Sequence, residues 1–225
     1  AHFEVIAQNM RLPTPADVDC ETEIWVKCDR GDVRVRVFRH NSGGVQPCLI
    51  YMHGGAFMQG SPETHWDITS RLASWNKQTV ISVDYALAPE HPFPIALEQV
   101  GTVIRWAHAN AIELGIDPAL ISIAGDSAGG QLAAAATLDM RGEVPLIAQL
   151  LIYPVTDWDR SRPSYAENPD GPLVKPDDKV MIMYCPDESL RNSPRVCPLY
   201  AASHAGLPPA FIAVGEHDPL RDSGV

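Results

Sequence analysis

Five short and almost continuously apolar runs constrain the fold of this chain more than any other feature of its sequence. These runs are Pro47–Met52, Thr79–Val83, Leu120–Ala124, Ile147–Tyr153 and Ala210–Val214. Strands that are apolar on both faces are typical of a parallel sheet covered by helices. Between the runs, Ile95–Leu114 repeats apolar residues at three- and four-residue steps and Ala128–Met140 is rich in alanine, so both are predicted to be helices. The order strand, helix, strand, helix indicates a doubly wound α/β sheet, whose ligand crevice lies at the carboxyl ends of the strands.

Two segments depart from this alternation. Ile24–Cys28 and Val33–Phe38 alternate apolar and polar residues around a charged turn, which predicts a β-hairpin at an antiparallel edge of the sheet. Residues 157–209 hold nine of the 20 prolines and one good helical stretch, Asp177–Tyr184. We expect this excursion to be a cap or lid over the crevice, with a surface loop that has no role as the open alternative.

Composition bounds the domain count and excludes several classes of partner. The 225 residues predict a single α/β domain over 1–225 that includes an N-terminal segment at 1–22. A net charge of −11 without a Lys/Arg run longer than two excludes a nucleic acid or an anionic lipid surface as a partner. No apolar run reaches the roughly 18 residues that membrane insertion needs. Five cysteines without a CxxC pair predict free thiols, no metal site and a reducing, cytoplasmic location.

The stretch Gly125-Asp126-Ser127-Ala128-Gly129 stands directly between an apolar strand and the alanine-rich helix. This context predicts a nucleophile elbow, in which Ser127 is held at the tip of a strained turn. Gly125 and Gly129 lack side chains, which lets strand and helix approach each other. A phosphate-binding loop is disfavoured because Gln131-Leu132 follows where that loop needs Lys and then Ser or Thr. A tight turn with a passive serine stays open.

A second glycine-rich stretch, His53-Gly54-Gly55-Ala56, follows the strand Pro47–Met52. Such a loop can direct backbone N–H groups at an oxyanion, and we expect the donors to be Gly55, Ala56 and Ala128. His53 precedes the nucleophile and lies in this loop, so we expect it to orient the loop by hydrogen bonds rather than to act as a base. A glycine turn that only reverses the chain is the alternative.

Asp218 follows the last apolar run and lies 218 − 127 = 91 residues after Ser127. In hydrolases that use a nucleophile elbow, the acid follows the serine along the chain, so Asp218 is the predicted acid. The pair Asp218-Pro219 is also typical of a helix N-terminus, a role that is compatible with catalysis.

Together these motifs resemble the hormone-sensitive-lipase-like carboxylesterases of the α/β-hydrolase superfamily. The resemblance extends to Asp84-Tyr85-Ala86-Leu87-Ala88-Pro89-Glu90-His91-Pro92-Phe93-Pro94 and to Gly206-Leu207-Pro208-Pro209-Ala210. It implies a mostly parallel twisted sheet with helices on both faces, and ester substrates with small acyl groups. It also implies that the reaction needs no cofactor and no metal. Ala56 and Ala86 depart from the usual Gly and Arg of the family.

The family resemblance places the catalytic histidine after the acid. None of the eight histidines follows Asp218, and His217 adjoins the acid too closely in sequence to lie between it and Ser127. We therefore expect the histidine to lie beyond residue 225 and the C-terminal part of the fold to be missing from this chain. A protein that ended at Val225 is predicted to be nearly inactive.

The resulting hypothesis is a serine carboxylesterase that hydrolyses short-chain, small-molecule esters through an acyl-enzyme intermediate. Two alternatives remain: a non-catalytic small-molecule-binding protein on the same fold, as in the gibberellin receptors, and a serine peptidase or amidase. Whether the protein forms a homo-oligomer is left open by the sequence.

Overall fold

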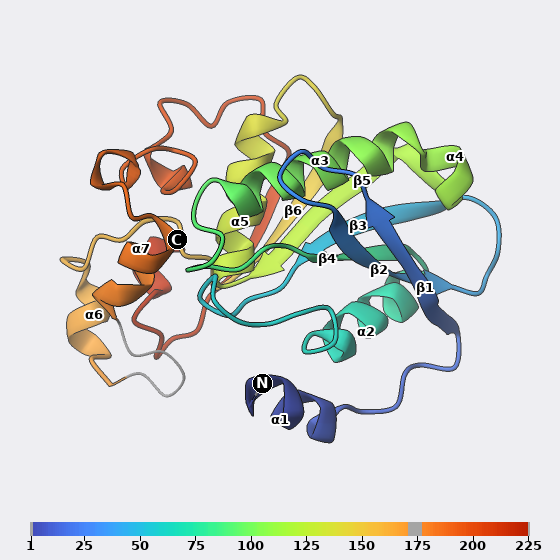
Figure 1. The fold of residues 1–225 in the computed structure, drawn as a ribbon, viewed down its shortest axis with the longest axis horizontal. Coiled ribbons are helices and arrows are strands. Elements are labelled where there is room, and N and C mark those ends of the chain that lie inside the picture. The colour runs from blue at the N-terminus through green and yellow to red at the C-terminus, as the bar shows by residue number, and fades with distance from the viewer. Residues whose placement is uncertain (1, 171–176, 225) are drawn as a thin grey trace.

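A seven-stranded sheet forms the centre of the computed structural model, which describes residues 2–170 and 177–224 (Figure 1). The strands lie in the order β1-β2-β4-β3-β5-β6-β7. Their bounds are β1 Val18–Val26, β2 Val33–His40, β3 Gln46–Met52, β4 Thr79–Asp84, β5 Ile116–Asp126, β6 Leu146–Ile152 and β7 Ala210–Ala213. Strands β4, β3, β5, β6 and β7 are parallel, and β1 and β2 form the predicted antiparallel hairpin at one edge. The predicted fold class is confirmed.

Helices cover both faces of the sheet (Figure 1). On one face α3 (Ile95–Ala109) and α5 (Ala128–Asp139) enclose the larger apolar core, which includes Ile50, Ile81 and Ile123. On the other face α2 (Trp66–Asn76) packs on a smaller cluster around Phe38. Because the central strands are apolar on both faces, each of the two helical layers buries the aliphatic side chains of the face that it covers.

The predicted helix over Ile95–Leu114 is two helices. The chain breaks at Asn110, which lies outside the helical region at φ −105° and ψ 22°, and α4 (Ala111–Leu114) follows. The Asn110 side chain donates to the Trp106 carbonyl at 2.8 Å, so it competes with the backbone bonds that would continue the helix. Gly115 then ends α4 in the left-handed region at φ 62°.

Two helices outside the excursion were not predicted, α1 (His2–Met10) and α2. Helix α2 buries Thr69, Ser70 and Ala73, three small or polar residues. The larger apolar residues of α2 that contact the core, Trp66, Ile68 and Leu72, are only partly buried and alternate with polar residues, so the apolar periodicity of this helix is weak.

Strand β7 has the predicted position and direction but not the burial expected for a central strand. It pairs with β6 alone among the described residues, and Phe211 is 68% exposed. The apolar run Ala210–Val214 predicted a strand covered on both faces, and the structure corrects this expectation.

The excursion at 157–209 holds α6 (Pro163–Glu167), α7 (Asp178–Tyr184) and two short 3₁₀ turns at Glu188–Leu190 and Pro198–Tyr200. Residues 171–176 of this segment lie outside the described residues. Helices α6 and α7 lie beyond the end of the sheet where the parallel strands finish (Figure 1). The excursion therefore adjoins the loops that carry the predicted motifs, whereas its role as a cap remains a prediction.

Candidate active site

Ser127 occupies the sharp turn between β5 and α5, as its sequence context predicts. Its backbone has φ 53° and ψ −117°, a region that residues with a side chain rarely adopt. A Cβ on Gly125 would lie 2.3 Å from the Gly129 carbonyl oxygen, and one on Gly129 would lie 2.1 Å from the Met52 carbonyl oxygen. The turn therefore needs both glycines, and it leaves the Ser127 side chain half-buried at its tip.

The glycine-rich loop that follows β3 lies beside this turn, because Met52 of β3 pairs with Gly125 of β5. Gly55 and Ala56 both have positive φ, 130° and 54°. A Cβ on Gly55 would lie 1.9 Å from the Gln59 carbonyl oxygen, so this position needs a glycine. The loop and the N-terminus of α5, which begins at Ala128, place the three predicted N–H donors at one end of the sheet.

Asp126 joins the loop to the elbow. Its Oδ1 accepts hydrogen bonds from the Gly54 N–H at 2.9 Å and from the Tyr51 hydroxyl at 2.8 Å. Burial would raise the pKa of Asp126, but hydrogen bonds from His65 and Tyr51 and the nearby imidazoles lower it below its ordinary value. Asp126 is therefore an ionised, buried carboxylate that fixes the loop against the elbow.

His53 is fully buried beneath the same loop. Its ring stacks on Tyr85 with centroids 4.3 Å apart, and its Nδ1 lies 2.8 Å from the Gly54 carbonyl oxygen. A carbonyl only accepts, so Nδ1 carries the proton. Burial, with a smaller contribution from His65, lowers the pKa of His53 to about 4, so the ring is neutral at neutral pH. The contact is compatible with the loop-orienting role expected of His53, which remains a prediction.

Asp218 follows β7 and is half-buried. Its Oδ1 accepts the Leu220 N–H at 2.8 Å, which closes a tight turn. The 3₁₀ helix that follows, Arg221–Ser223, has Leu220 as its N-cap and no side-chain capping bond, so the helix-capping role considered for Asp218 is wrong. Burial raises the pKa of Tyr153, and the charges of Asp126 and Asp218 raise it further, so both carboxylates act on this one phenol at the end of β6. His217, beside the acid, is exposed. The roles of Ser127 as nucleophile and Asp218 as acid remain predictions.

Sequence reasoning missed the aromatic and imidazole side chains that surround these motifs. Tyr85 donates its hydroxyl proton to the His53 carbonyl at 2.6 Å, and His65 lies 3.3 Å from Asp126. Tyr85 was quoted only as part of the family resemblance. No local pattern marks His65, because its partner is 61 residues away along the chain.

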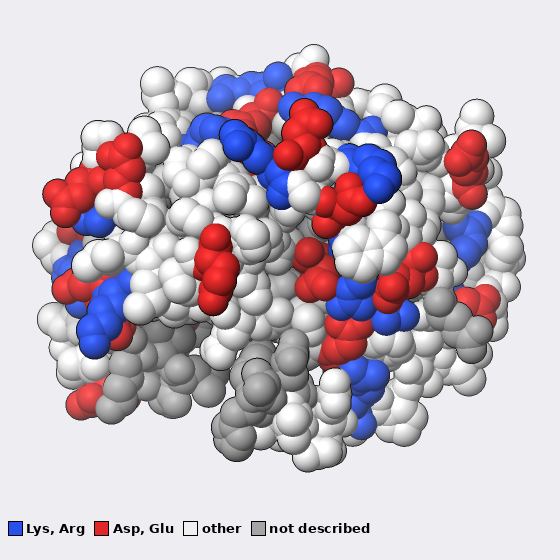
Figure 2. Space-filling view, in the orientation of Figure 1, with Lys and Arg blue, Asp and Glu red and all other residues white. Residues whose placement is uncertain are grey.

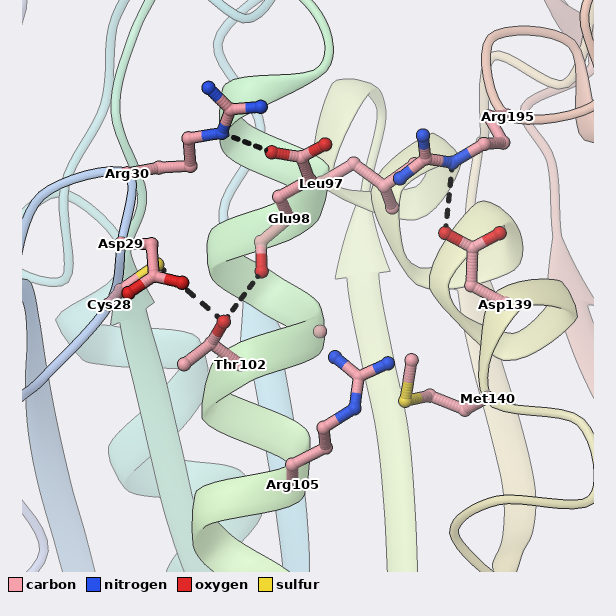
Figure 3. Close-up of a pocket in the computed structure, with 11 residues that line it drawn as sticks. Cys28, Asp29, Arg30, Leu97, Glu98, Thr102, Arg105, Asp139, Met140 and Arg195 are labelled. Carbon is pink, nitrogen blue, oxygen red and sulfur yellow. Dashed lines mark hydrogen bonds and ion pairs between the residues drawn. The ribbon is translucent and has the colours of Figure 1, made fainter.

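A separate groove of about 440 Å³ lies along α3 and α5 (Figure 3). Its guanidinium groups are paired: Arg30 contacts Glu98 at 2.6 Å and Arg195 contacts Asp139 at 3.0 Å. Arg105 is paired with Glu143. None of the predicted site residues lines this groove, and its positive charges are compensated by neighbouring carboxylates.

Positive and negative side chains intermingle on the face drawn in Figure 2. In the β1-β2 hairpin, Arg34 and Arg36 share the carboxylates of Glu23 and Glu63. Among the helices of the described ranges, none has the length and apolar character needed to cross a bilayer.

Comparison with known proteins agrees with the observed fold. Residues 49–225 match a family model described as alpha/beta hydrolase fold. Carboxylesterase NlhH of Mycobacterium tuberculosis is 42% identical over 185 residues, which cover 79% of this chain and 58% of that protein. An arylesterase of Saccharolobus solfataricus is 37% identical over 219 residues, 93% of this chain and 70% of that protein.

Solved structures of esterases have the same architecture. An esterase from Pyrobaculum calidifontis superposes with a TM-score of 0.91 at 36% identity, and the match covers 99% of this chain and 75% of that one. The chain spans less than two thirds of the length of several curated relatives, 58% of NlhH among them.

Proposed function

The chain belongs to the hormone-sensitive-lipase-like family of the alpha/beta hydrolase fold, and from this membership we propose that the full-length protein is a serine carboxylesterase acting on short-chain esters. The relatives are named carboxylesterase, esterase and arylesterase. None of these names supports a receptor or a peptidase.

The proposed reaction starts with attack by the Ser127 hydroxyl on the acyl carbon of the ester. The N–H groups of Gly55, Ala56 and Ala128 stabilise the negative charge that develops on the carbonyl oxygen, forming the oxyanion hole. The alcohol then leaves with the proton taken from Ser127, and water hydrolyses the acyl-enzyme to release the acid. Asp218 orients the histidine that relays these protons, and we propose that this histidine lies beyond residue 225.

One observation carries the proposal: the strained Ser127 turn is tied directly to the glycine-rich loop. The backbone of Ser127 at φ 53° is maintained by close packing of Gly125 and Gly129. The hydrogen bond from the Gly54 N–H to Asp126, at 2.9 Å, holds the loop beside it. A passive turn has no need of strain combined with a carboxylate bridge to a second loop, and strain of this kind is typical of functional positions.

Ester turnover by the full-length protein tests the proposal. We expect hydrolysis of p-nitrophenyl acetate and butyrate by the parent and its near-complete loss in Ser127→Ala, with folding intact. Ser189→Ala removes an exposed hydroxyl from a 3₁₀ turn and is the matched control, expected to leave turnover unchanged. Equal hydrolysis by Ser127→Ala and the parent would contradict the assignment, and comparable turnover of p-nitroacetanilide would favour an amidase.

We also propose a reducing, cytoplasmic location, which is supported by the five free cysteines Cys20, Cys28, Cys48, Cys185 and Cys197. Alkylation of the protein isolated from its own cells, followed by peptide mass spectrometry, is expected to find each of these five cysteines as a free thiol. A homo-oligomer remains a prediction that light scattering can test.

A further inference from the structure

His65 has a position that helix formation alone does not explain. It stands directly before α2, at the N-cap, yet its side chain makes no capping hydrogen bond to the helix. Its Nε2 instead lies 3.3 Å from Oδ2 of Asp126, and its Nδ1 lies 2.8 Å from Oγ1 of Thr64. Both ring nitrogens are engaged, so the imidazole has a fixed orientation toward the elbow.

The hydrogen bond between His65 and Asp126 runs from the ring to the carboxylate. Asp126 is ionised, as its lowered pKa indicates, and an ionised carboxylate only accepts. Nε2 of His65 must therefore carry the proton. The two side chains are only 15% and 10% exposed, so water competes weakly for this contact.

The two oxygens of Asp126 divide between His65 and the glycine-rich loop. Oδ1 accepts the Gly54 N–H, whereas Oδ2 faces His65. A Cβ on Gly54 would lie 2.2 Å from Oδ2, so the carboxylate packs directly on the loop backbone. Rotation of the carboxylate therefore displaces Gly54 and the N–H groups that follow it.

A second contact joins His65 to the same loop. The rings of His65 and His53 lie 5.5 Å apart, and His53 in turn stacks on Tyr85 and bonds to the Gly54 carbonyl. His65 thus supports the loop both through Asp126 and through the His53 ring.

We propose that His65 is a positioning residue that holds Asp126 and, through it, fixes the Gly55 and Ala56 N–H groups in the geometry that stabilises the oxyanion. The catalytic consequence rests on the proposed function. His65 itself does not touch the reacting atoms. Because oxyanion contacts strengthen in the transition state, their misplacement lowers kcat while leaving KM almost unchanged.

The test compares His65→Leu and His65→Gln in the full-length protein with p-nitrophenyl butyrate as substrate. Leucine removes the donor to Asp126, and we expect kcat to fall about ten- to hundredfold with KM within about twofold of the parent. Glutamine places an amide N–H where Nε2 stood, and we expect it to recover most of kcat. His91→Leu and His91→Gln, at an exposed histidine, are the matched controls and should change neither constant.

The assignment is overturned if His65→Leu keeps the parent kcat. It is equally overturned if leucine and glutamine lower kcat and the unfolding temperature to the same extent, because that result describes a structural role only.

Amide hydrogen exchange tests the positioning role of His65 independently of ester turnover. We expect faster amide exchange over residues 53–58 in His65→Leu, with β4 unchanged, and near-parental exchange in His65→Gln. Unchanged exchange over 53–58 would refute the positioning role even in a protein without ester turnover. Failure of the parent to hydrolyse esters would instead contradict the proposed function, while the exchange result still decides the role of His65.

Discussion

The carboxylate of Asp126 has more partners than any other acidic group at the site, and its removal should change stability as well as activity. Oδ1 accepts from Gly54 and Tyr51, and Oδ2 faces the Nε2–H of His65. In Asp126→Asn the side-chain NH₂ can take either of two positions. If it faces His65, it meets the Nε2–H and two donors oppose each other. If it faces Gly54 and Tyr51, their N–H and O–H groups lose their acceptor. We expect the free energy of unfolding to fall by about 1–3 kcal/mol, measured in urea.

The Asp126 carboxylate should also make the free energy of unfolding depend on pH. The pKa of Asp126 is lower in the folded protein than its ordinary value of 3.8. Its contribution to stability is therefore fully present above the unfolded pKa and is lost as pH falls through the folded pKa. Urea unfolding between pH 6 and about pH 3 should show a shallower decline for Asp126→Asn than for the parent. Parallel curves would mean that folding does not lower the pKa of Asp126.

A side chain at position 129 is expected to destabilise the protein by steric overlap. The absence of a side chain at Gly129 lets α5 contact the end of β3, since a Cβ there would lie 2.1 Å from the Met52 carbonyl. Gly129→Ala should lower the free energy of unfolding by about 1–3 kcal/mol or more because backbone must move. Gly215→Ala is the control, because its Cβ would meet Asp218 at an ordinary 3.5 Å and should change stability by less than about 0.5 kcal/mol. Equal effects of the two substitutions would refute the close approach.

For individual residues, the sequence predicts contacts between neighbours along the chain and misses contacts between residues far apart along it. The spacing of Gly125 and Gly129 around Ser127 predicts the tight turn, because the steric demand lies within five consecutive residues. The contact between His65 and Asp126 depends on α2, whose own pattern is too weak to predict. A pair that far apart in sequence is found only once the fold is known.

At the scale of elements, Gln131 of α5 fastens the 157–209 excursion to the site. Its side chain is fully buried, and its Nε2 donates to the carbonyls of Arg195 and Val196 at 2.9 and 3.0 Å. Tyr184 of α7 adds a second attachment, since its ring stacks on Phe57, directly after the glycine-rich loop, with centroids 3.7 Å apart. These contacts support the prediction that the excursion is a cap rather than a loop without a role.

Gln131→Leu is therefore expected to loosen the excursion selectively. Two carbonyls lose their donor, and limited proteolysis should cut within residues 186–205 several times faster than in the parent. Asp139→Asn removes only the exposed ion pair with Arg195, which is worth about 0.2–1 kcal/mol, and should leave the cleavage rate nearly unchanged. Faster cleavage in the sheet rather than in the excursion would argue against an anchoring role for Gln131.

The parallel strands β3, β4, β6 and β7 were predicted to within one residue at each end, whereas β5 begins at Ile116, four residues before its predicted start at Leu120. The break at Asn110 was missed because apolar spacing continues through it, and only the side-chain bond to Trp106 reveals the competition with the helix. Within the excursion the helical stretch predicted at Asp177–Tyr184 is confirmed as α7. The five-residue helix α6 and the contacts with α5 have no periodic signal and depend on tertiary packing.

At the scale of the whole molecule, the exposed strand β7 distinguishes this chain from a fully covered sheet. Phe211 and Ile212 are 68% and 43% exposed, and an apolar groove of about 310 Å³ lies beside β7 and α5. The sequence predicts that β7 is a parallel strand but not that it is exposed, because its apolar run is the same whether or not another layer covers it. The relatives are longer than this chain, which supports the proposal that the fold continues past residue 225.

The proposed continuation of the fold past residue 225 predicts that residues 1–225 alone lack the catalytic base. Ser127, the predicted N–H donors and Asp218 all lie within residues 53–218, and the only member of the proposed triad without a residue assigned to it is the histidine. A protein consisting of residues 1–225 should therefore retain the elbow and the glycine-rich loop. It should turn over p-nitrophenyl butyrate at least about 10⁴-fold more slowly than the full-length enzyme, as expected when a triad loses its base.

Circular dichroism would first establish that the shorter protein folds. In the full-length protein, each histidine beyond residue 225 is then replaced by alanine, and one of them should match Ser127→Ala in its loss of turnover. If the 1–225 protein hydrolyses the ester as fast as the full-length enzyme, the base lies within the described chain, and buried His53 and His65 become the groups to substitute next.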